Sequence, residues 1–547
     1  MVLCYNNLII KNKERGKHDR RGPVVRTLMD QEKKSPELET PPCETGGDIP
    51  EQGTPPEGQP EQPKVQAKII RTTLDDLPAG EGNEHNEARV RGKNPLPEGV
   101  TSKMLYKDVL RIAWPSFVEM MLMQLASMVD LMMVGKLGPW AISAVGLTTQ
   151  PKFLMGMAFM SLNVGNMALV ARYRGAGKQE EAKLVLRQSM LLNVVLSFIL
   201  AVIGYIYAEP LILFMGAEDA QTLAGGTSYL KIQMVGLLTV SITTTITNAL
   251  RAVGDSKTSM RYNLTANLVN VVFNYLLIYG HFGFPRLEVT GASLATVIGQ
   301  FVGMLMALYA ILRKDQYVRL EIRKGFKPDI VMLKNIWHIG MPAMMEQLVM
   351  RVGIIIYAKT VASLGTVLLA AHQVCMNIQA LTFMNGQSFA VSATSLVGQS
   401  LGKRRGDMAV NYSKRVQRLG MWVAIGIALA IFFFPREFIL MYNDDPVILD
   451  VGVTVLRMVA LIQPLQASQF ILAGAMRGAG DTKYTAMVTF ITVLLVRPII
   501  AIYTIKVLEW GLIGAWIAMV ADQLLRTTLI FLRYNSGKWR NAYRHKS

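Results

Sequence analysis

The sequence predicts an all-α integral membrane protein with twelve transmembrane helices, and three observations lead to that prediction. The 547-residue chain is 51% hydrophobic and 18% charged, with a mean hydropathy of +0.29, so it is more apolar than an ordinary soluble domain. The apolar residues are concentrated after residue 103. From there the chain contains twelve apolar stretches, each near or above the roughly 20 residues that cross about 30 Å of hydrocarbon as a helix. This composition argues against a soluble enzyme.

Residues 1–103 form a separate polar tail, which holds 12 of the 23 prolines. The stretch 35–63 has almost no large apolar side chains, so it cannot bury enough surface to offset the entropy of ordering. We therefore expect the tail to be disordered. Its basic cluster follows its short apolar start, the reverse of the order in a secretory signal, so no cleaved leader is predicted.

The twelve stretches divide into two sets of six. Their approximate centres are residues 122, 156, 196, 236, 271, 302, 347, 384, 424, 461, 496 and 522. We expect an N-terminal six-helix lobe at 104–322, a C-terminal six-helix lobe at 323–536, and a basic C-terminal tail at 537–547.

The connecting loops differ strongly in positive charge. Loops that would lie on one side, together with the C-terminal tail, hold 28 Lys and Arg residues, and loops on the other side hold four. By the positive-inside rule, both termini are cytoplasmic. The net charge of +18 is then explained by topology, so we expect no nucleic-acid partner.

The two halves repeat each other in the same direction. The segment IAWPSFVE returns as IGMPAMME at an offset of 227 residues, which aligns Glu119 with Glu346. RAVGDSK (251–257) returns as RGAGDTK (477–483). Because six helices is an even number, both halves enter the membrane from the same side, the parallel-repeat arrangement of some secondary transporters. A substrate path between two lobes is the natural inference.

Motifs for energy-consuming or catalytic chemistry are missing from the sequence. It contains no phosphate loop, no HExxH, no Cys-x-x-Cys and no Ser-nucleophile elbow. The three cysteines have no metal-ligand spacing. We therefore expect a protein that is not an enzyme, needs no cofactor, and draws energy from an ion gradient.

Ionisable groups at membrane depth are costly, so each is a candidate functional residue. In the first helix, Glu119 and Asp130 share one face about 16 Å apart. The fifth helix carries one polar stripe, formed by Asn263, Asn267, Asn270 and Asn274. Amide oxygens and a carboxylate suit a small cation such as Na⁺, and a desolvated Asp can bind a proton. Alternatively, the asparagines bind neighbouring helices by hydrogen bonds.

Embedded polar residues of the second half are Glu346, Arg351, His372, Gln373, Arg497 and Asp522. Glu346 and Arg351 are about 140° apart around the helix and do not pair along one face. His372 fits a packing role better than a proton shuttle.

Several motifs resemble the multidrug and toxic compound extrusion (MATE) family, within the MOP superfamily. They are the WP start and VDLMMVGKLG of the first helix, the RxxGD-K loop of each half, NYLLIYGxFGxP, GASLATV, and AAHQV in the eighth helix. The resemblance covers about residues 104–535. It implies two six-helix lobes, alternating access, and export of varied organic compounds in exchange for H⁺ or Na⁺.

The resemblance also implies where the coupling cation binds. The family pattern for the N-terminal lobe falls on Asp130, Asn270, Asn274 and Thr296. Acidic residues that one branch uses in the C-terminal lobe are replaced here by Met350 and Gln466. We therefore place the coupling site in the N-terminal lobe, with H⁺ and Na⁺ both open.

We expect the substrate cleft to include Glu119, Asn267, Glu346 and Arg351. The expected partners are small organic, cationic or amphiphilic substrates and membrane lipids. We expect a monomer in the plasma membrane.

Two other functions compete with export. A flippase for lipids or lipid-linked glycans would suit a cleft in which Arg351 and Arg497 line the path, because arginine pairs with phosphate. A membrane scaffold acting through its tail would lose function when residues 1–100 are deleted, whereas an exporter would change little. A major-facilitator transporter ranks below these, since its G-x-x-x-D-R loop is absent.

Overall fold

A computed structural model describes residues 72–80, 94–217, 219–321, 324–441 and 445–542, and the regular structure within these ranges is helical. Within the described ranges, eleven helices are long and apolar enough to cross a membrane. The long helices are α2 (Ser102–Gly135), α3 (Pro139–Gly175), α4 (Gln179–Ile206), α6 (Ala220–Ala252), α7 (Ser256–Tyr279), α8 (Glu288–Leu312), α9 (Ile330–Ala362), α10 (Thr366–Gly402), α11 (Gly406–Phe433), α13 (Pro446–Gly478), the continuous run α14, η3 and α15 (Thr482–Thr489, Phe490–Val496, Arg497–Lys506), and α16 (Gly511–Asn535).

Helix α7 is not among these eleven, because its polar asparagine stripe lowers its mean hydropathy. Every predicted centre from 122 to 522 lies in one of these helices. The short elements are α5 (Ala208–Phe214), α12 (Pro435–Leu440), η1 (His281–Gly283) and η4 (Lys538–Asn541). The all-α membrane fold is confirmed.

The internal repeat is visible element by element. Helices α3 and α10 both have 37 residues, α4 and α11 both have 28, α6 and α13 both have 33, and α8 and α16 both have 25. Gly138 and Gly365 precede α3 and α10 with φ of 115° and 97°, a backbone region that favours glycine. The same turn therefore starts the second helix of each half.

The fifth pair of helices breaks this symmetry. Helix α7 is regular over 24 residues, whereas its counterpart changes to a seven-residue π-helical segment, Phe490–Val496, directly before Arg497 and Pro498. Proline lacks an N–H group and its ring collides with the preceding turn of an α-helix, so a wider turn relieves the clash. The two halves thus differ at the helix that carries the asparagine stripe in the first.

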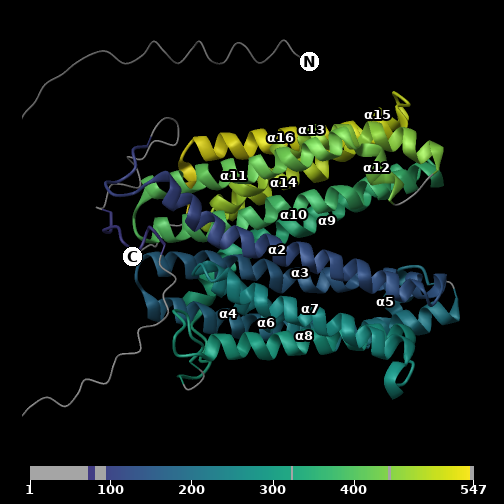
Figure 1. Cartoon of the computed structure of the whole chain (residues 1–547), viewed down its shortest axis with the longest axis horizontal. Helices are drawn as coiled ribbons and strands as arrows, with labels where there is room; N and C mark the ends of the chain where they lie inside the picture. The colour runs from purple at the N-terminus through teal and green to yellow at the C-terminus, as the bar shows by residue number, and fades with distance from the viewer. Residues whose placement is uncertain (1–71, 81–93, 218, 322–323, 442–444, 543–547) are drawn as a thin grey trace, which may run out of the picture. The chain divides into compact units, whose positions relative to one another are not determined.

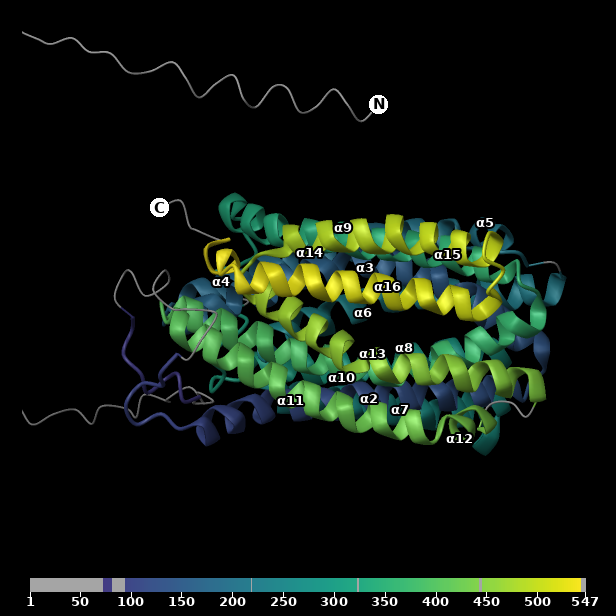
Figure 2. The same cartoon turned by 90° about the horizontal axis from the view of Figure 1, so that it is seen from above.

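Helices of the two halves meet along α2, α3, α9 and α10. In Figure 1 α2 and α3 lie along the boundary between the helices of the two halves, and in both views the long helices run roughly parallel (Figures 1 and 2). Helix α3 ends, α9 begins and α10 ends at one end of the bundle, on the left in Figure 1. We call this the basic end, because the loops rich in Lys and Arg lie there.

At the basic end the backbones of the two halves are in direct contact. A Cβ atom on Gly165 would lie 2.6 Å from the Ile336 carbonyl oxygen, and Cβ atoms on Gly175 and Gly402 would overlap backbone atoms of Gln399 and Arg172. Small residues permit such close approach of membrane helices. The halves are therefore closed against each other at this end.

Hydrogen bonds cross the same interface. Ser395 Oγ and Gln399 Nε2 on α10 donate to the Ala252 carbonyl oxygen at the end of α6, at 3.0 and 2.7 Å. Both side chains are fully or nearly fully buried. This closed end is a defined structural state, with polar as well as steric complementarity.

Part of the predicted tail belongs to this closed end. Residues 72–80 and 94–101 are described, and Leu74, Leu96 and Val100 pack in or against a core that the start of α2 forms with helices of the C-terminal half. Helix α2 begins at Ser102, where Thr101 Oγ1 accepts from the Met104 N–H. The expectation of one disordered tail over 1–103 therefore needs correction for these two segments, while residues 1–71 and 81–93 lie outside the described residues.

The glycine contacts generate a first prediction. Replacing Gly402 by Val should push the halves apart at the basic end, because the added side chain overlaps the Arg172 backbone. A cysteine at position 395, in a chain whose three native cysteines are replaced by alanine, should then react with a maleimide several-fold faster.

The matched control is Gly426→Val in α11, where an added Cβ meets open space. Unchanged labelling of Ser395→Cys in the Gly402→Val protein would contradict the closed interface.

Candidate functional site

The carboxylate of Asp130 lies among the polar side chains of α7 and α8. Asn274 Nδ2 donates to Asp130 Oδ1 at 2.6 Å. With its amide nitrogen turned toward Asp130, Asn270 donates to both carboxylate oxygens at 2.9 and 3.1 Å, and its amide oxygen accepts from the Thr296 hydroxyl at 3.1 Å. The structure thus brings together all four residues that were expected to form the cation site.

This cluster is built to supply oxygen ligands. Asn270 and Asn274 are 5% and 1% exposed, whereas Asp130 is partly exposed. Asn274 Oδ1 is buried and has no hydrogen-bond partner within the described residues. A buried unpaired acceptor beside a carboxylate fits a cation, because a cation satisfies both groups at once.

The asparagine stripe does not act as one unit. Asn270 and Asn274 face Asp130, but Asn263 Nδ2 donates to Glu119 Oε1 at 2.6 Å, and Asn267 Nδ2 donates to the Asn263 carbonyl oxygen of its own helix at 2.9 Å. The structure therefore does not connect Asn267 with the Asp130 cluster.

Lys152 on α3 is a charged neighbour that the sequence analysis did not single out. It interacts electrostatically with Asp130, and its Nζ lies 5.9 Å from the centre of the Tyr229 ring. An ionisable residue inside an apolar stretch was the available signal, next to Pro151. Lys152 supplies a positive charge that any cation at Asp130 must compete with.

Glu119 is held in a buried ion pair. Its Oε1 lies 2.8 Å from Nη2 of Arg251, at the end of α6, and the Glu119 side chain is 2% exposed. Glu119 was expected to line a substrate cleft. In this structure it instead joins α2 to α6 and α7 inside the N-terminal half.

The repeat preserves this pair in the second half. Arg477 Nη2 lies 2.7 Å from Glu346 Oε1, and the Thr485 hydroxyl donates to Glu346 Oε2 at 3.0 Å. Glu346 is 3% exposed, so it too is held in a buried ion pair within its half. The repeated RxxGD-K loop therefore provides the arginine that neutralises the repeated glutamate.

Arg351 on α9 reaches the opposite half. Its guanidinium carbon lies 3.7 Å from the centre of the Phe153 ring on α3, a cation–π contact. Arg351 is partly exposed. Arg351 is one of the four residues expected at the cleft, and this contact places it at the interface between the two halves.

The remaining embedded charges form a network inside the C-terminal half. Asp522 is fully buried and accepts from Arg497 and from Arg526, which lies 2.7 Å away. His372 is buried beside the rings of Tyr357 and Trp516, at centroid distances of 5.7 and 5.5 Å. The burial of His372 fits the packing role that its position favoured.

A second buried polar network holds α3, α4 and α6 together. Asn193 Nδ2 donates to Asn163 Oδ1 at 2.9 Å and to Thr245 Oγ1 at 3.0 Å, and Asn166 Nδ2 donates to the Thr245 carbonyl oxygen. These contacts satisfy polar groups that the bilayer core would leave unpaired.

Outside the membrane-spanning segments, the loop before α9 is tied to α4 at the basic end. Hydrogen bonds from Lys183 and Lys324, with Nζ to carboxylate distances of 2.9 and 2.6 Å, lower the pKa of Glu321 to about 2. The connection between the two halves is therefore anchored at the end where the halves are closed.

Within the described residues, no three His, Cys, Asp or Glu side chains gather as a metal site. The Asp130 cluster has one carboxylate with amide and hydroxyl groups, a donor set of low charge. Such a set suits a proton or a small monovalent cation better than a transition metal.

Comparison with known proteins places this geometry in context. The MatE family model matches residues 115–276 and 342–502, one match in each half. A protein of Thermotoga maritima named probable multidrug resistance protein NorM is 28% identical over 448 residues, covering 82% of this chain and 96% of its own length. The uncharacterized transporter YisQ of Bacillus subtilis is 25% identical, covering 79% and 94%.

Solved structures share the fold. A multidrug resistance MATE family transporter of the MOP superfamily, described as outward-facing, superposes with a TM-score of 0.74 at 22% identity, covering 84% of this chain and all of its own. A MOP superfamily transporter from Pyrococcus furiosus, described as having a binding pocket of reverse polarity, gives a TM-score of 0.73 at 22% identity with the same coverage.

The repeated ion pairs generate a second prediction. Glu119→Gln should lower the free energy of unfolding by about 3–5 kcal/mol, because it leaves the Arg251 charge buried without its partner. Thermal unfolding in detergent, followed by tryptophan fluorescence, would measure the loss.

Glu288→Gln is the control, since Glu288 and Arg286 form an exposed pair and such pairs contribute about 0–1 kcal/mol. Equal effects of the two substitutions would contradict a structural role for the Glu119 pair.

Proposed function

Because this chain belongs to the MatE family of transporters, we propose that it exports organic compounds in exchange for H⁺ or Na⁺ by alternating access between its two halves. The chain is a multi-pass membrane transporter and not an enzyme. Relatives named as multidrug resistance proteins support substrates that are small, organic and chemically varied. We propose that it acts in the plasma membrane as a monomer without a cofactor.

One observation carries the proposal, the cluster of Asp130 with Asn270, Asn274 and Thr296. A carboxylate in the bilayer core is costly when it is unpaired, and here it is held by amides. Binding a cation neutralises the carboxylate and satisfies the Asn274 oxygen. Coupling then follows if the cation binds one arrangement of the halves more tightly than the other, since a ligand shifts an equilibrium by its difference in affinity.

Lys152 provides a positive charge near Asp130 in addition to the cation that we propose to bind there. Its interaction with Asp130 opposes cation binding, so release of the cation can be accompanied by closer pairing with Lys152. Lys152 belongs to α3 and Asp130 to α2. Cation exchange at Asp130 would therefore alter the attraction between two helices that lie at the interface of the halves.

Charge and closure together support an orientation in the membrane and a conformational state. The positive-inside rule assigns the basic end to the cytoplasm. The contacts of Ser395 and Gln399 with Ala252 close that end, which supports an outward-facing state with both termini cytoplasmic. Asp130 lies near the C-terminal end of α2, far from the closed end.

The flippase alternative needs arginines free to bind a phosphate head group. Arg497 is 8% exposed and paired with Asp522, and the Arg351 guanidinium stacks on Phe153. These contacts favour export of organic compounds over transfer of a lipid phosphate.

The third prediction tests the coupling site. Asp130→Asn should abolish gradient-driven efflux while the protein still folds, because the substitution removes both an anionic ligand and the titratable group. The measurement is efflux of a fluorescent organic cation from proteoliposomes under an imposed H⁺ gradient and, separately, an imposed Na⁺ gradient.

Glu209→Gln, on the exposed short helix α5, is the control and should transport as the unmodified protein does. Gradient-driven efflux retained by Asp130→Asn would overturn the site. If neither gradient drives efflux in the folded unmodified protein, labelled lipid-linked glycans become the substrate to test.

A further inference from the structure

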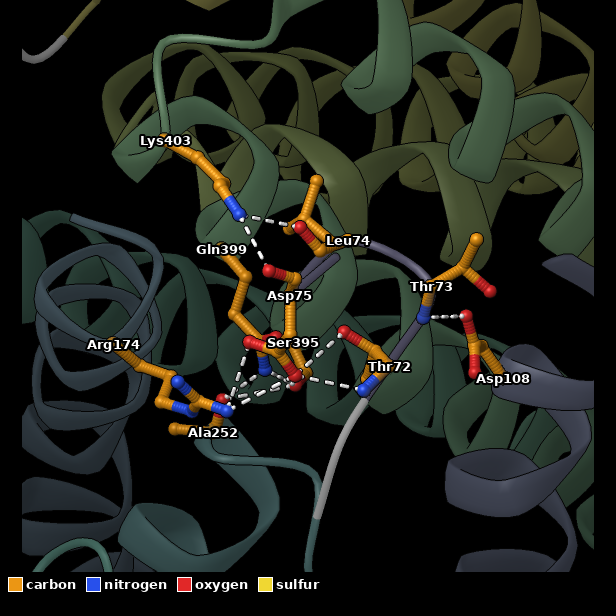
Figure 3. Close-up of polar contacts among 10 residues, drawn as sticks. All are labelled: Thr72, Thr73, Leu74, Asp75, Asp108, Arg174, Ala252, Ser395, Gln399 and Lys403. Atoms are coloured by element: carbon orange, nitrogen blue, oxygen red, sulfur yellow. Dashed lines mark hydrogen bonds and ion pairs between the residues drawn. The ribbon is translucent and has the colours of Figure 1, made fainter. Parts of the chain in front are cut away.

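Residues 72–80 lie outside the segments matched by the family model, yet they contact both halves at the basic end. Figure 3 shows Asp75 facing Arg174 at the end of α3. The Asp75 carboxylate oxygens lie 3.0 and 3.1 Å from Arg174 Nη2. The Thr72 N–H also donates to this carboxylate at 2.8 Å, which orients it toward the N-terminal half.

The same segment is bound by the C-terminal half through Lys403. Lys403 Nζ donates to the carbonyl oxygens of Leu74 and Asp75 at 2.6 and 3.1 Å. The Gly80 N–H donates to the Lys403 carbonyl oxygen at 3.1 Å. Burial lowers the pKa of Lys403, so its ammonium depends on these two carbonyl oxygens as substitutes for water.

A buried leucine and a carboxylate provide further contacts with residues 72–80. Leu74 is 2% exposed and packs in the core that includes Leu105 and Leu401. The Thr73 N–H and the Tyr412 hydroxyl both donate to Asp108 at 2.8 Å. The two halves therefore contact this segment through its backbone, through the Asp75 carboxylate and through the buried side chain of Leu74.

These contacts bridge the interface at which the two halves must separate during alternating access. Arg174 adjoins Gly175, and Lys403 adjoins Gly402, the two glycines at the closest backbone contacts between α3 and α10. Opening of the basic end moves Arg174 away from Lys403. Residues 72–80 cannot keep both partners in that movement.

We propose that residues 72–80 are a strap that docks across the two halves and stabilises the state closed at the basic end. This inference rests on alternating access, the proposed function. Release of the strap then raises the population of the state open at the basic end, because a segment that binds one state shifts the equilibrium toward it. The polar N-terminal tail thereby controls the transport cycle without taking part in ion coupling.

The experiment uses the full chain with Ser395→Cys as reporter and its three native cysteines replaced by alanine. Asp75→Asn should increase the rate of maleimide labelling about tenfold, since a hydrogen bond to a charged group is lost. Asp76→Asn is the matched control, because Asp76 carries the same charge one residue later and is exposed. Labelling requires no transport, so a failed transport assay leaves this test intact.

A second variant lacks residues 1–80, and a peptide of residues 70–82 is added back. The truncated protein should label as fast as Asp75→Asn, and the peptide should slow labelling again. Equal rates for Asp75→Asn and the unmodified chain, or equal effects of Asp75→Asn and Asp76→Asn, would overturn the strap.

A separate feature of the N-terminal half is a cavity of about 930 Å³ between α2, α7 and α8. Four cationic residues line it, namely Arg111, Lys257, Arg261 and Arg313. Asp255 and Asp315 also line it, but Asp255 caps α7 by accepting from Thr258, and Asp315 lies 3.3 Å from Arg313. The cavity therefore has an excess of positive charge at the start of a long helix, where anions are favoured.

One wall of this cavity is apolar and faces outward. Leu305, Met306 and Tyr309 on α8 are 49%, 36% and 69% exposed. In a membrane protein, such a surface contacts acyl chains, and an aromatic ring near a basic cluster is typical of the head-group region. Basic pockets between membrane helices suit anionic head groups.

We infer that this cavity binds one phospholipid with an anionic head group, with the phosphate among the cations and an acyl chain along α8. A lipid head group and free inorganic phosphate would both offer an anion to the cationic residues. The apolar wall favours the lipid, because only the lipid has an acyl chain to pack against it. Binding should stabilise the contact of α2 with α7 and α8.

The test compares thermal unfolding of the full chain in neutral detergent with phosphatidylglycerol, with phosphatidylcholine, or with inorganic phosphate. Phosphatidylglycerol should raise the Tm, and the double variant Lys257→Gln, Arg261→Gln should lose that increase. Lys314→Gln, an exposed neighbour that does not line the cavity, should keep it. An equal increase with inorganic phosphate, or one that the double variant retains, would overturn the lipid site.

Discussion

The bilayer core supplies no water, so polar groups inside it must find partners within the protein. This constraint explains where most of the embedded charges lie. Glu119 pairs with Arg251, Glu346 pairs with Arg477, and Asp522 pairs with two arginines. Except for Asp522 with Arg526, which lie four residues apart on α16, these pairs join helices within one half, which makes each half a unit that can move as a body.

Asp130 is satisfied differently. The amides of Asn270 and Asn274 donate hydrogen bonds to Asp130, whereas arginines pair with the other carboxylates. Lys152 on α3 interacts with Asp130 electrostatically. An amide neutralises no charge, so the charge of Asp130 is not cancelled as it is for the arginine-paired carboxylates. This difference is the physical basis on which we propose Asp130 as the site of the coupling ion.

The interface between the halves depends on a different constraint, which is close contact between helix backbones. Glycines such as Gly175 and Gly402 let α3 and α10 touch, and such an interface is gained or lost as a whole. The strap adds a charged contact, Asp75 with Arg174, to this closure. In our proposal, a polar segment outside the residues matched by the family model thereby controls the movement between the two halves.

The sequence by itself determined the membrane fold, the twelve spans and the repeat, because apolar length and charge asymmetry are local properties. It also singled out Asp130, Asn270 and Asn274, since polar residues inside apolar stretches are visible without a structure. Tertiary structure alone decided which embedded residues pair. Glu119 and Asp130 share one helix face, yet one meets an arginine from α6 and the other meets amides from α7. Helix periodicity gives the face of a residue but not the neighbour packed against it, and for a charge in a membrane that neighbour decides its role.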